Sequence, residues 1–223
     1  MLKNYNLIST PMNKLLILFV IIILSSCRPN SSKDDGLSKT SLADTSLALN
    51  IDSNGKPIHL AKKQDSLQIK VLSKSFKFTK DEFDVEGKQW VRPINEPNYV
   101  NRNTIYSYFM KINGIASNLR FVIQYYGDDW LFIQKYQFSI DGQAFEYAPR
   151  NVETDSGDGG MVWEWFDDQA DTNLKTILRA ISKSKTTKVK MIGKQYFDII
   201  TVTSKQKESI RKTLALYRLL GGD

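Results

Sequence analysis

The sequence predicts an α+β domain: a largely antiparallel β-meander sheet with two amphipathic helices packed on one face. Residues 119–147 contain three aromatic and β-branched runs, separated by the turn sequences Gly127-Asp128-Asp129 and Asp141-Gly142. This pattern is typical of antiparallel strands joined in chain order. Two stretches nearer the C-terminus carry apolar residues at helical spacing, which predicts the two helices.

The chain opens with the features of an export signal. Lys3 and Lys14 are the only charged residues before Arg28, and residues 15–24 form an unbroken apolar run. At roughly 1.5 Å per residue, this run covers about half of a ~30 Å bilayer core, so it is too short for an ordinary transmembrane helix. A basic start followed by a short apolar run is typical of a secretory signal peptide, here residues 1–26.

The sequence Leu24-Ser25-Ser26-Cys27, which ends the apolar run, resembles the lipobox of bacterial lipoproteins. The resemblance implies that Cys27 becomes the first mature residue and carries a diacylglycerol thioether and an N-linked acyl chain such as palmitate. Several acyl chains anchor a protein durably, at about 0.8 kcal/mol per buried CH₂. The competing interpretation is an incidental cysteine after an ordinary signal. No second cysteine exists, so disulfides and cysteine metal sites are not expected.

Residues 27–64 are expected to be the lipidated cysteine and a flexible tether. They are rich in Ser, Asn, Asp and Lys, a composition that buries too little apolar surface to offset chain entropy. Within them, Lys33-Asp34-Asp35 is similar to a signal by which some bacteria with two membranes display lipoproteins on the cell surface. The predicted location is the cell envelope, with the outer membrane favoured and the periplasmic or surface face left open. The only histidine, His59, lies in or beside this tether.

Residues 65–223 are expected to form one globular domain. Residues 68–78 alternate loosely and predict one or two strands. Residues 104–112 predict a further strand, and Asn113-Gly114 begins its turn.

The central strands are predicted at residues 119–126 and 130–140, each with one apolar face and one mixed face. Residues 161–166 predict a short strand or the start of a helix. Residues 188–202 predict a hairpin with a two-residue turn at Gly193-Lys194.

The two helices are delimited by capping residues. Thr172 is the predicted N-cap of a helix that runs to about Ser182. Thr203 and Gln206 fit a capping box for the last helix, and Gly221-Gly222 fit its C-terminal cap. Residues 118–133 and 192–198, followed by this helix and its two glycines, resemble a pattern of uncharacterised bacterial envelope lipoproteins. That resemblance implies one intact domain and no particular activity.

Few residues of this chain suit catalysis. With His59 alone, Ser/His and Cys/His catalysis and an ordinary zinc site are not expected. No cofactor or metal is predicted, because the aspartates of residues 155–160 lack the spacing of a calcium loop. Two carboxylate pairs could supply acid and base for a glycan hydrolase, although adjacent aspartates are usually turn formers and caps. These candidates are Asp128, Asp129, Asp167 and Asp168.

Two tryptophans are candidate binding residues. Trp163 and Trp165 flank Glu164 and would share one face of a strand. Such a pair can form a platform for sugars or a hot spot for a protein partner. The competing interpretation is that both tryptophans pack in the core.

Charge is unevenly distributed along the chain. Without Lys3 and Lys14, 29 basic residues face 24 acidic ones, a net charge near +5. Residues 141–171 carry nine acidic residues and one basic residue, whereas residues 172–223 carry twelve basic and three acidic ones. The two segments either neutralise each other or face an outside partner such as an envelope protein or an anionic glycan or lipid. Nucleic acid is not an expected partner of an exported domain. The candidate cations are Lys183, Lys185, Lys188, Lys190 and Lys194.

Taken together, these observations predict a membrane-anchored lipoprotein with a non-enzymatic domain that binds a ligand or protein in the cell envelope. The alternative is a carboxylate-dependent hydrolase acting on envelope or external glycans. Two carboxyls close together beside exposed tryptophans would favour the alternative.

Overall fold

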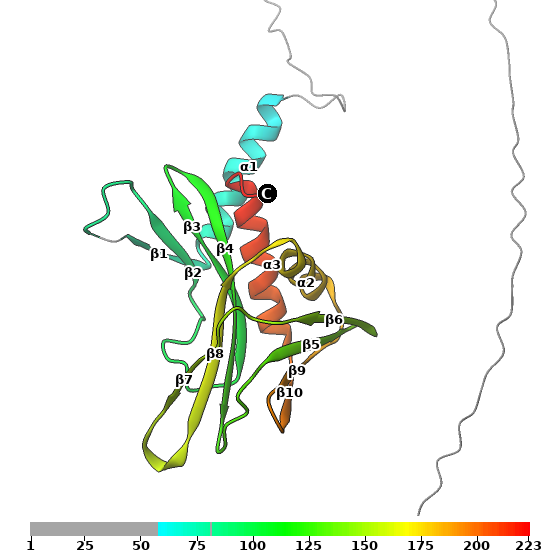
Figure 1. Cartoon of the computed structure of the whole chain (residues 1–223). Helices are drawn as coiled ribbons and strands as arrows, with labels where there is room; N and C mark the ends of the chain where they lie inside the picture. Colours follow the sequence, from blue (N-terminus) through cyan, green and yellow to red (C-terminus); the bar gives the residue numbers. More distant parts are fainter. Residues whose placement is uncertain (1–57, 81) are drawn as a thin grey trace, which may run out of the picture. The chain divides into compact units, whose positions relative to one another are not determined.

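The computed structural model describes residues 58–80 and 82–223, with side chains from residue 65 onward except that of Asp158. The expected signal peptide, Cys27 and most of the expected tether therefore lie outside the described residues. The described part contains three α-helices and ten strands (Figure 1). The helices are α1 (Ile58–Ser73), α2 (Thr172–Lys183) and α3 (Ser204–Leu219). The expected α+β class is confirmed, and its strands form two antiparallel sheets.

The larger sheet has six strands in the order β1-β2-β3-β4-β8-β7. Its members are β1 (Phe76–Lys80), β2 (Gln89–Pro93), β3 (Thr104–Ile112), β4 (Ile115–Gly127), β7 (Glu153–Ser156) and β8 (Val162–Gln169). The strand predicted at residues 104–112 is confirmed, and so is the turn after it. Asn113 and Gly114 both have positive φ, 50° and 87°, which is the backbone of a two-residue hairpin turn.

The smaller sheet has four strands in the order β10-β9-β5-β6. Its members are β5 (Lys135–Ile140), β6 (Gln143–Tyr147), β9 (Thr187–Ile192) and β10 (Phe197–Thr201). Asp141-Gly142 forms the expected turn between β5 and β6, where Ile140 pairs with Gln143. β5 and β6 project beside α2, away from the long strands of the larger sheet (Figure 1).

The single meander expected from residues 119–147 is wrong in one respect: β4 and β5 belong to different sheets. β4 pairs with β8, and residues 130–134 form no strand. Phe132, within this segment, has a φ of 55°, which breaks strand geometry. The expected 130–140 strand therefore begins only at Lys135.

Three other local predictions are corrected. Residues 58–73 form α1, so the helix begins inside the expected tether and replaces the strand predicted from residue 68. The N-cap of α2 is Asp171 and not Thr172, because the Asp171 carboxylate accepts a hydrogen bond from the Leu174 amide. The β9–β10 turn contains four residues, since Ile192 pairs with Phe197.

The core lies between the sheets and helices and includes apolar side chains from most strands, whereas β7 is exposed throughout. Leu174, Ile177, Leu178 and Ile181 of α2 are fully buried, as their helical spacing predicts. α3 packs on β3: Phe109 and Tyr217 meet edge to face, with ring centroids 5.4 Å apart. Both ends of α3 match the prediction. Thr203 and Gln206 form the capping box, and the amides of Gly221 and Gly222 bond to the carbonyls of Arg218 and Tyr217, as in a Schellman motif.

Candidate binding surface on the large sheet

The larger sheet has one face on the core and a second, outer face opposite α3. Ser107 and Phe109 contact α3, so strand alternation turns Tyr106 and Tyr108 to the other side. The residues that share this outer face are unusually aromatic and include two arginines. They include Trp90, Arg92, Tyr106, Tyr108, Arg120, Val122, Gln124, Tyr126, Trp163, Trp165 and Asp167, and the exposed Glu153 and Asp155 of β7 lie beside the tryptophans.

The centre of the outer face is a small cluster of its own. Tyr106, Tyr108 and Val122 are buried there, with Trp90 packed against them. Trp90 meets Tyr108 edge to face at 5.4 Å, and the Arg92 guanidinium carbon lies 3.8 Å from the Tyr108 ring centroid. Aromatic rings that also hold a guanidinium form a stiff, flat surface.

Asp167 connects two strands of this face. The Arg120 side chain donates to its carboxylate from Nε at 2.7 Å and to its backbone carbonyl from a terminal nitrogen. The Tyr108 hydroxyl donates to the second carboxylate oxygen. Burial and then this hydrogen bond raise the pKa of Tyr108 well above its usual value. The Asp167 carboxyl is therefore held in place by two side-chain donors from neighbouring strands.

A second carboxyl lies at the edge of the same face. Glu96 pairs with Arg92, with 3.4 Å between carboxylate oxygen and guanidinium nitrogen. Burial raises the pKa of Glu96. The positive charge of Arg92 partly offsets this increase, and the negative charge of Asp167 adds to it. Burial, and then the charge of Glu96, raise the pKa of Tyr106 to about 12. Glu96 was not among the sequence candidates, because it lies in the connection after β2, where no periodic pattern indicates that it folds back toward Arg92.

Trp163 and Trp165 lie half-buried on the outer face, outside the main core. They share one side of β8, as a strand at this position predicts. Trp163 stacks on Tyr126 with ring centroids 6.3 Å apart and planes at 29°. Among the described side chains, the buried Nε1 of Trp163 and the buried Oε1 of Gln124 have no hydrogen-bond partner. Both atoms are buried, so neither is exposed to a ligand in this conformation.

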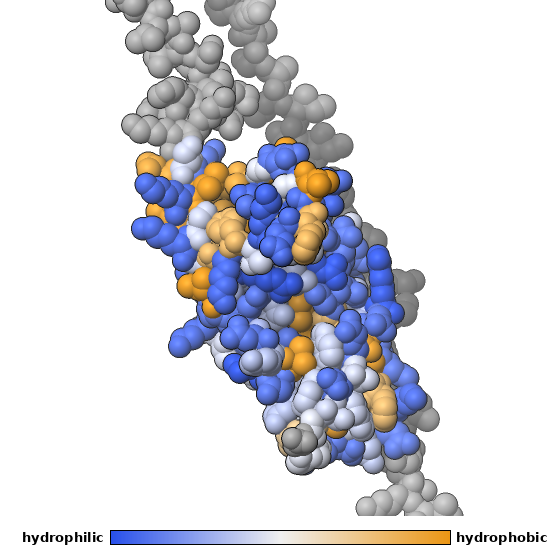
Figure 2. Space-filling view, turned by 90° about the vertical axis from the view of Figure 1, so that its left-hand side faces the viewer, coloured by the Kyte–Doolittle hydropathy of each residue, from blue (hydrophilic) through white to orange (hydrophobic). Residues whose placement is uncertain are grey.

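The side of the molecule shown in Figure 2 is mostly hydrophilic, with small, separate hydrophobic areas. Pale, weakly polar surface gathers toward its lower end, at the height where β7 turns into β8 in Figure 1. Tryptophan and tyrosine, which are apolar bodies with polar tips, suit such an amphipathic surface. Contacts made there would combine ring stacking with hydrogen bonds.

The four aspartates proposed for catalysis do not form acid–base pairs within the described structure. Asp128 and Asp129 are exposed in the turn after β4, where Asp129 accepts from the Trp130 amide. Asp167 and Asp168 point to opposite faces of β8, as neighbours on a strand must. Asp168 is buried on the core side, where it accepts from the Tyr147 hydroxyl and the Arg150 amide. Only Asp167 belongs to the outer face.

Glu164, between the two tryptophans, is a residue that the sequence analysis missed. Its side chain is fully buried and accepts from the amides of Leu131, Phe132 and Ile133 at 2.6, 2.8 and 2.8 Å. Each of these amides would otherwise be an unsatisfied donor. The available signal was a charged residue at an inward position of an apolar strand.

The candidate lysines lie apart from the tryptophans. Lys188 and Lys190 are on the outer face of the smaller sheet, Lys194 is in the β9–β10 turn, and Lys185 precedes β9. Among the described side chains, no ion pair joins residues 141–171 to residues 172–223. The closest link is Asp141, whose carboxylate accepts from the amides of Lys185 and Thr186.

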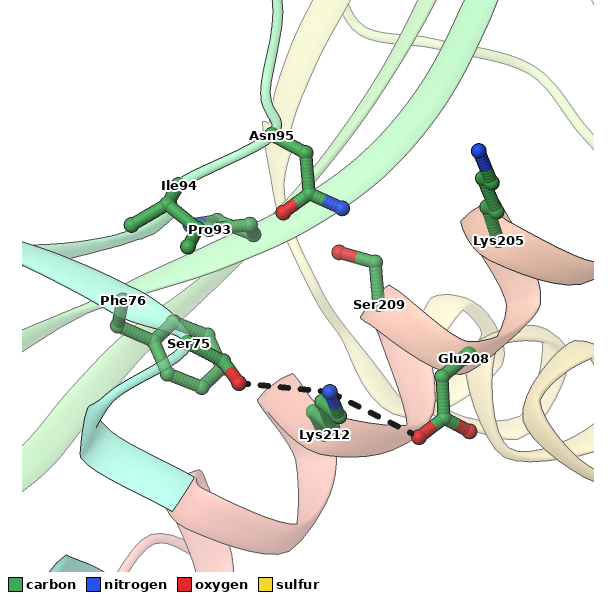
Figure 3. A pocket seen from close by; sticks show the side chains of 9 residues that line it. All are labelled: Ser75, Phe76, Pro93, Ile94, Asn95, Lys205, Glu208, Ser209 and Lys212. Carbon is green, nitrogen blue, oxygen red and sulfur yellow. Dashed lines mark hydrogen bonds and ion pairs between the residues drawn. The ribbon is translucent and has the colours of Figure 1, made fainter. Parts of the chain in front are cut away.

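A hollow of 270 Å³ lies between α3 and the connection after β2 (Figure 3). Lys212 crosses it, with Nζ 3.4 Å from Ser75 Oγ and 3.9 Å from a Glu208 carboxylate oxygen. Asn95 and Ser209 line the opposite part (Figure 3). Because Lys212 already has two partners and the hollow contains few apolar side chains, it is a weaker candidate than the outer face.

Within the described residues, no cluster of histidine, cysteine and acidic side chains could hold a metal ion. No helix there is long and apolar enough to cross a bilayer. No protein-family model, no curated protein and no solved structure matches the chain. Its function is therefore inferred from its own residues.

Proposed function

We propose that this chain is a lipoprotein of the cell envelope, anchored through acylated Cys27, whose domain binds a ligand or protein partner without catalysing a reaction. The outer face of the larger sheet is the proposed binding surface. The observation that carries this assignment is the concentration of half-buried tryptophans, tyrosines and paired arginines on a sheet face opposite the helix that closes the core.

Support for the anchor comes from the sequence Leu24-Ser25-Ser26-Cys27 and the apolar run before it. If α1 begins the domain at Ile58, about 30 residues separate it from the anchor. Such a chain would span on the order of 30 Å as a flexible coil, at about 5–6 Å times the square root of its length. The domain could then reach beyond the lipid headgroups.

The chemistry of the outer face suits a ligand with rings or flat apolar edges and several hydroxyl or amide groups. Trp163 and Tyr126 would stack on such rings. The ion pairs Arg120–Asp167 and Arg92–Glu96 add no net charge to the face and present both donors and acceptors. Two exposed acidic residues of β7, Glu153 and Asp155, lie beside the tryptophans. Envelope glycans and extended polypeptides both have this character.

Trp163→Ala tests the binding face. We expect it to abolish capture of envelope glycans or proteins crosslinked to the anchored chain, while the melting temperature falls by only a few degrees, since the ring lies outside the main core. Phe78→Ala, which removes an exposed aromatic ring from the opposite face of the same sheet, is the control and should retain capture. Equal capture by Trp163→Ala and wild type would remove the face from the proposal.

One observation favours the hydrolase as a second candidate. Glu96, with its raised pKa, and Asp167, paired with Arg120 at 2.7 Å, lie on the same face as the tryptophans. Glycan hydrolysis needs one carboxyl as the acid and a second as the nucleophile or base, and two carboxyls in unlike environments suit these roles. Cleavage of an envelope glycan by the wild type, lost in Glu96→Gln and Asp167→Asn, would establish this alternative. Binding without product release would favour the non-enzymatic role.

A further inference from the structure

The end of the smaller sheet, where β9 turns into β10, carries large apolar side chains that face solvent. We name these four residues the tip patch: Phe132, Tyr196, Phe197 and Ile199. Each is at least half exposed, with values of 50, 61, 57 and 50%. Grouped apolar exposure of this kind marks an interaction site more often than single exposed residues do.

Lysines lie among the members of the tip patch. Lys190 Nζ lies 3.8 Å from the centroid of the Phe197 ring, and Lys194 Nζ lies 5.2 Å from that of Phe132. Lys188 and Lys190 also line a 440 Å³ hollow on the same sheet face, together with Ile199, Ala144 and Phe145. The hollow thus combines an apolar floor with two cations.

Few carboxylates oppose these lysines. Glu146, at the far side of the hollow, is paired with Lys135 at 3.2 Å and with Gln137 at 3.0 Å. Asp198 belongs to β10, but it pairs with Met191 and so points to the opposite face from Phe197 and Ile199. Asp128 and Asp129 lie in the turn after β4, which precedes Phe132. The sheet face itself remains cationic.

The tip patch is held on a fixed backbone. The Lys194 amide donates to the Leu131 carbonyl at 3.1 Å, and the Gln134 amide donates to the Ile192 carbonyl at 2.8 Å. These bonds join the segment that carries Phe132 to the turn that carries Tyr196. Exposed aromatic side chains on such a support do not collapse onto the domain, although burial in the core would be favourable for them.

We propose that the tip patch and its lysines dock the domain on the surface of an anionic bilayer. The lysines would meet phosphate groups of acidic lipids, and Phe132, Tyr196 and Phe197 would enter the interface between headgroups and acyl chains. This inference rests on the proposed anchoring, since a domain tethered at Cys27 is held near a bilayer. The outer face of the larger sheet is a separate surface and stays available for a ligand.

The test uses the full chain as isolated from cells, with the state of Cys27 read by mass spectrometry, mixed with phosphatidylcholine vesicles with or without phosphatidylglycerol. Tyr196→Cys provides a labelling site for an environment-sensitive fluorophore, and Val85→Cys, at a 98% exposed position between β1 and β2, provides a reference site. Docking predicts a blue-shifted, quencher-protected label at residue 196 with phosphatidylglycerol only, and a water-exposed label at residue 85 throughout. High salt should reverse the shift.

Lys188→Glu with Lys190→Glu should reduce the docked fraction by about tenfold or more. The control is Lys183→Glu with Lys205→Glu, which makes the same charge change on two exposed helix lysines. This control should retain most of the docked fraction. A label at residue 196 that stays in water on anionic vesicles, in protein that floats with them and is acylated at Cys27, would overturn docking alone. Protein that does not float and has a bare Cys27 would overturn the anchor.

Discussion

At the scale of single residues, Glu164 shows how one side chain determines the path of a distant segment. Its buried carboxylate accepts three consecutive amides from residues 131–133. These bonds hold Phe132 at a φ of 55° and keep this part of the chain out of the larger sheet. The strand signal of residues 130–134 is therefore overruled by a contact more than 30 residues away in sequence.

Glu164→Gln should lower the free energy of unfolding by about 2 to 4 kcal/mol, because hydrogen bonds to a buried charge are strong and one of the three amides would face an NH₂ group. Denaturant unfolding measures the loss. Glu153→Gln, on the exposed strand β7, is the matched control and should change stability by less than about 0.5 kcal/mol. Equal stability of the two variants would contradict the role assigned to Glu164.

Asp141 gives a prediction for pH dependence. Hydrogen bonds from the amides of Thr186 and then Lys185 lower the pKa of this exposed carboxyl below 3.8. The Asp141 carboxyl thus binds its proton less tightly in the folded chain than in the unfolded chain. Its ionised form therefore stabilises the fold above pH 3.8, and this stabilisation is lost as the pH falls through the lower pKa of the folded state.

Asp141→Asn keeps a residue that tolerates the positive φ of this turn but removes the charge. Wild type should be more stable than the variant at neutral pH, and the difference should vanish in acid. Thermal unfolding across the pH range measures it. A difference that stays constant down to the lowest pH would show that ionisation of Asp141 plays no part.

At the scale of elements, the β9–β10 turn requires glycine at position 193, because the Leu131 backbone leaves no room for a side chain there. A Cβ on Gly193 would lie 1.8 Å from the Leu131 carbonyl oxygen, which is backbone and cannot rotate away. Gly114 differs, because its φ is 87° but nothing lies within 4 Å of a Cβ there. Gly193 is thus required by close packing, and Gly114 by its backbone conformation.

Gly193→Ala should therefore destabilise the domain by more than about 2 kcal/mol and Gly114→Ala by about 1 kcal/mol. Chemical denaturation of both variants gives the comparison. If Gly193→Ala were the milder change, the segment of residues 130–134 could not lie against this turn as described.

At the scale of the whole molecule, local patterns were enough to predict the α+β class, the strand at residues 104–112, the Asn113-Gly114 and Asp141-Gly142 turns and both caps of α3. Each depends on residues within a few positions of one another. The division into two sheets could not be predicted, because it depends on Glu164 reaching residues 131–133. Strand alternation was enough to predict that Trp163 and Trp165 share a face. The Arg120–Asp167 pair could not be predicted, because it depends on the register between β4 and β8. The Arg92–Glu96 pair depends on the path of the loop after β2.

The central proposal is that an acylated cysteine keeps a binding domain at a membrane. Mass spectrometry of the N-terminal peptide of the native protein tests it most directly. The predicted result is a mature chain that begins at Cys27 and carries a diacylglycerol thioether and an N-linked acyl chain. A peptide that retains residues 1–26 and a bare Cys27 thiol would contradict it.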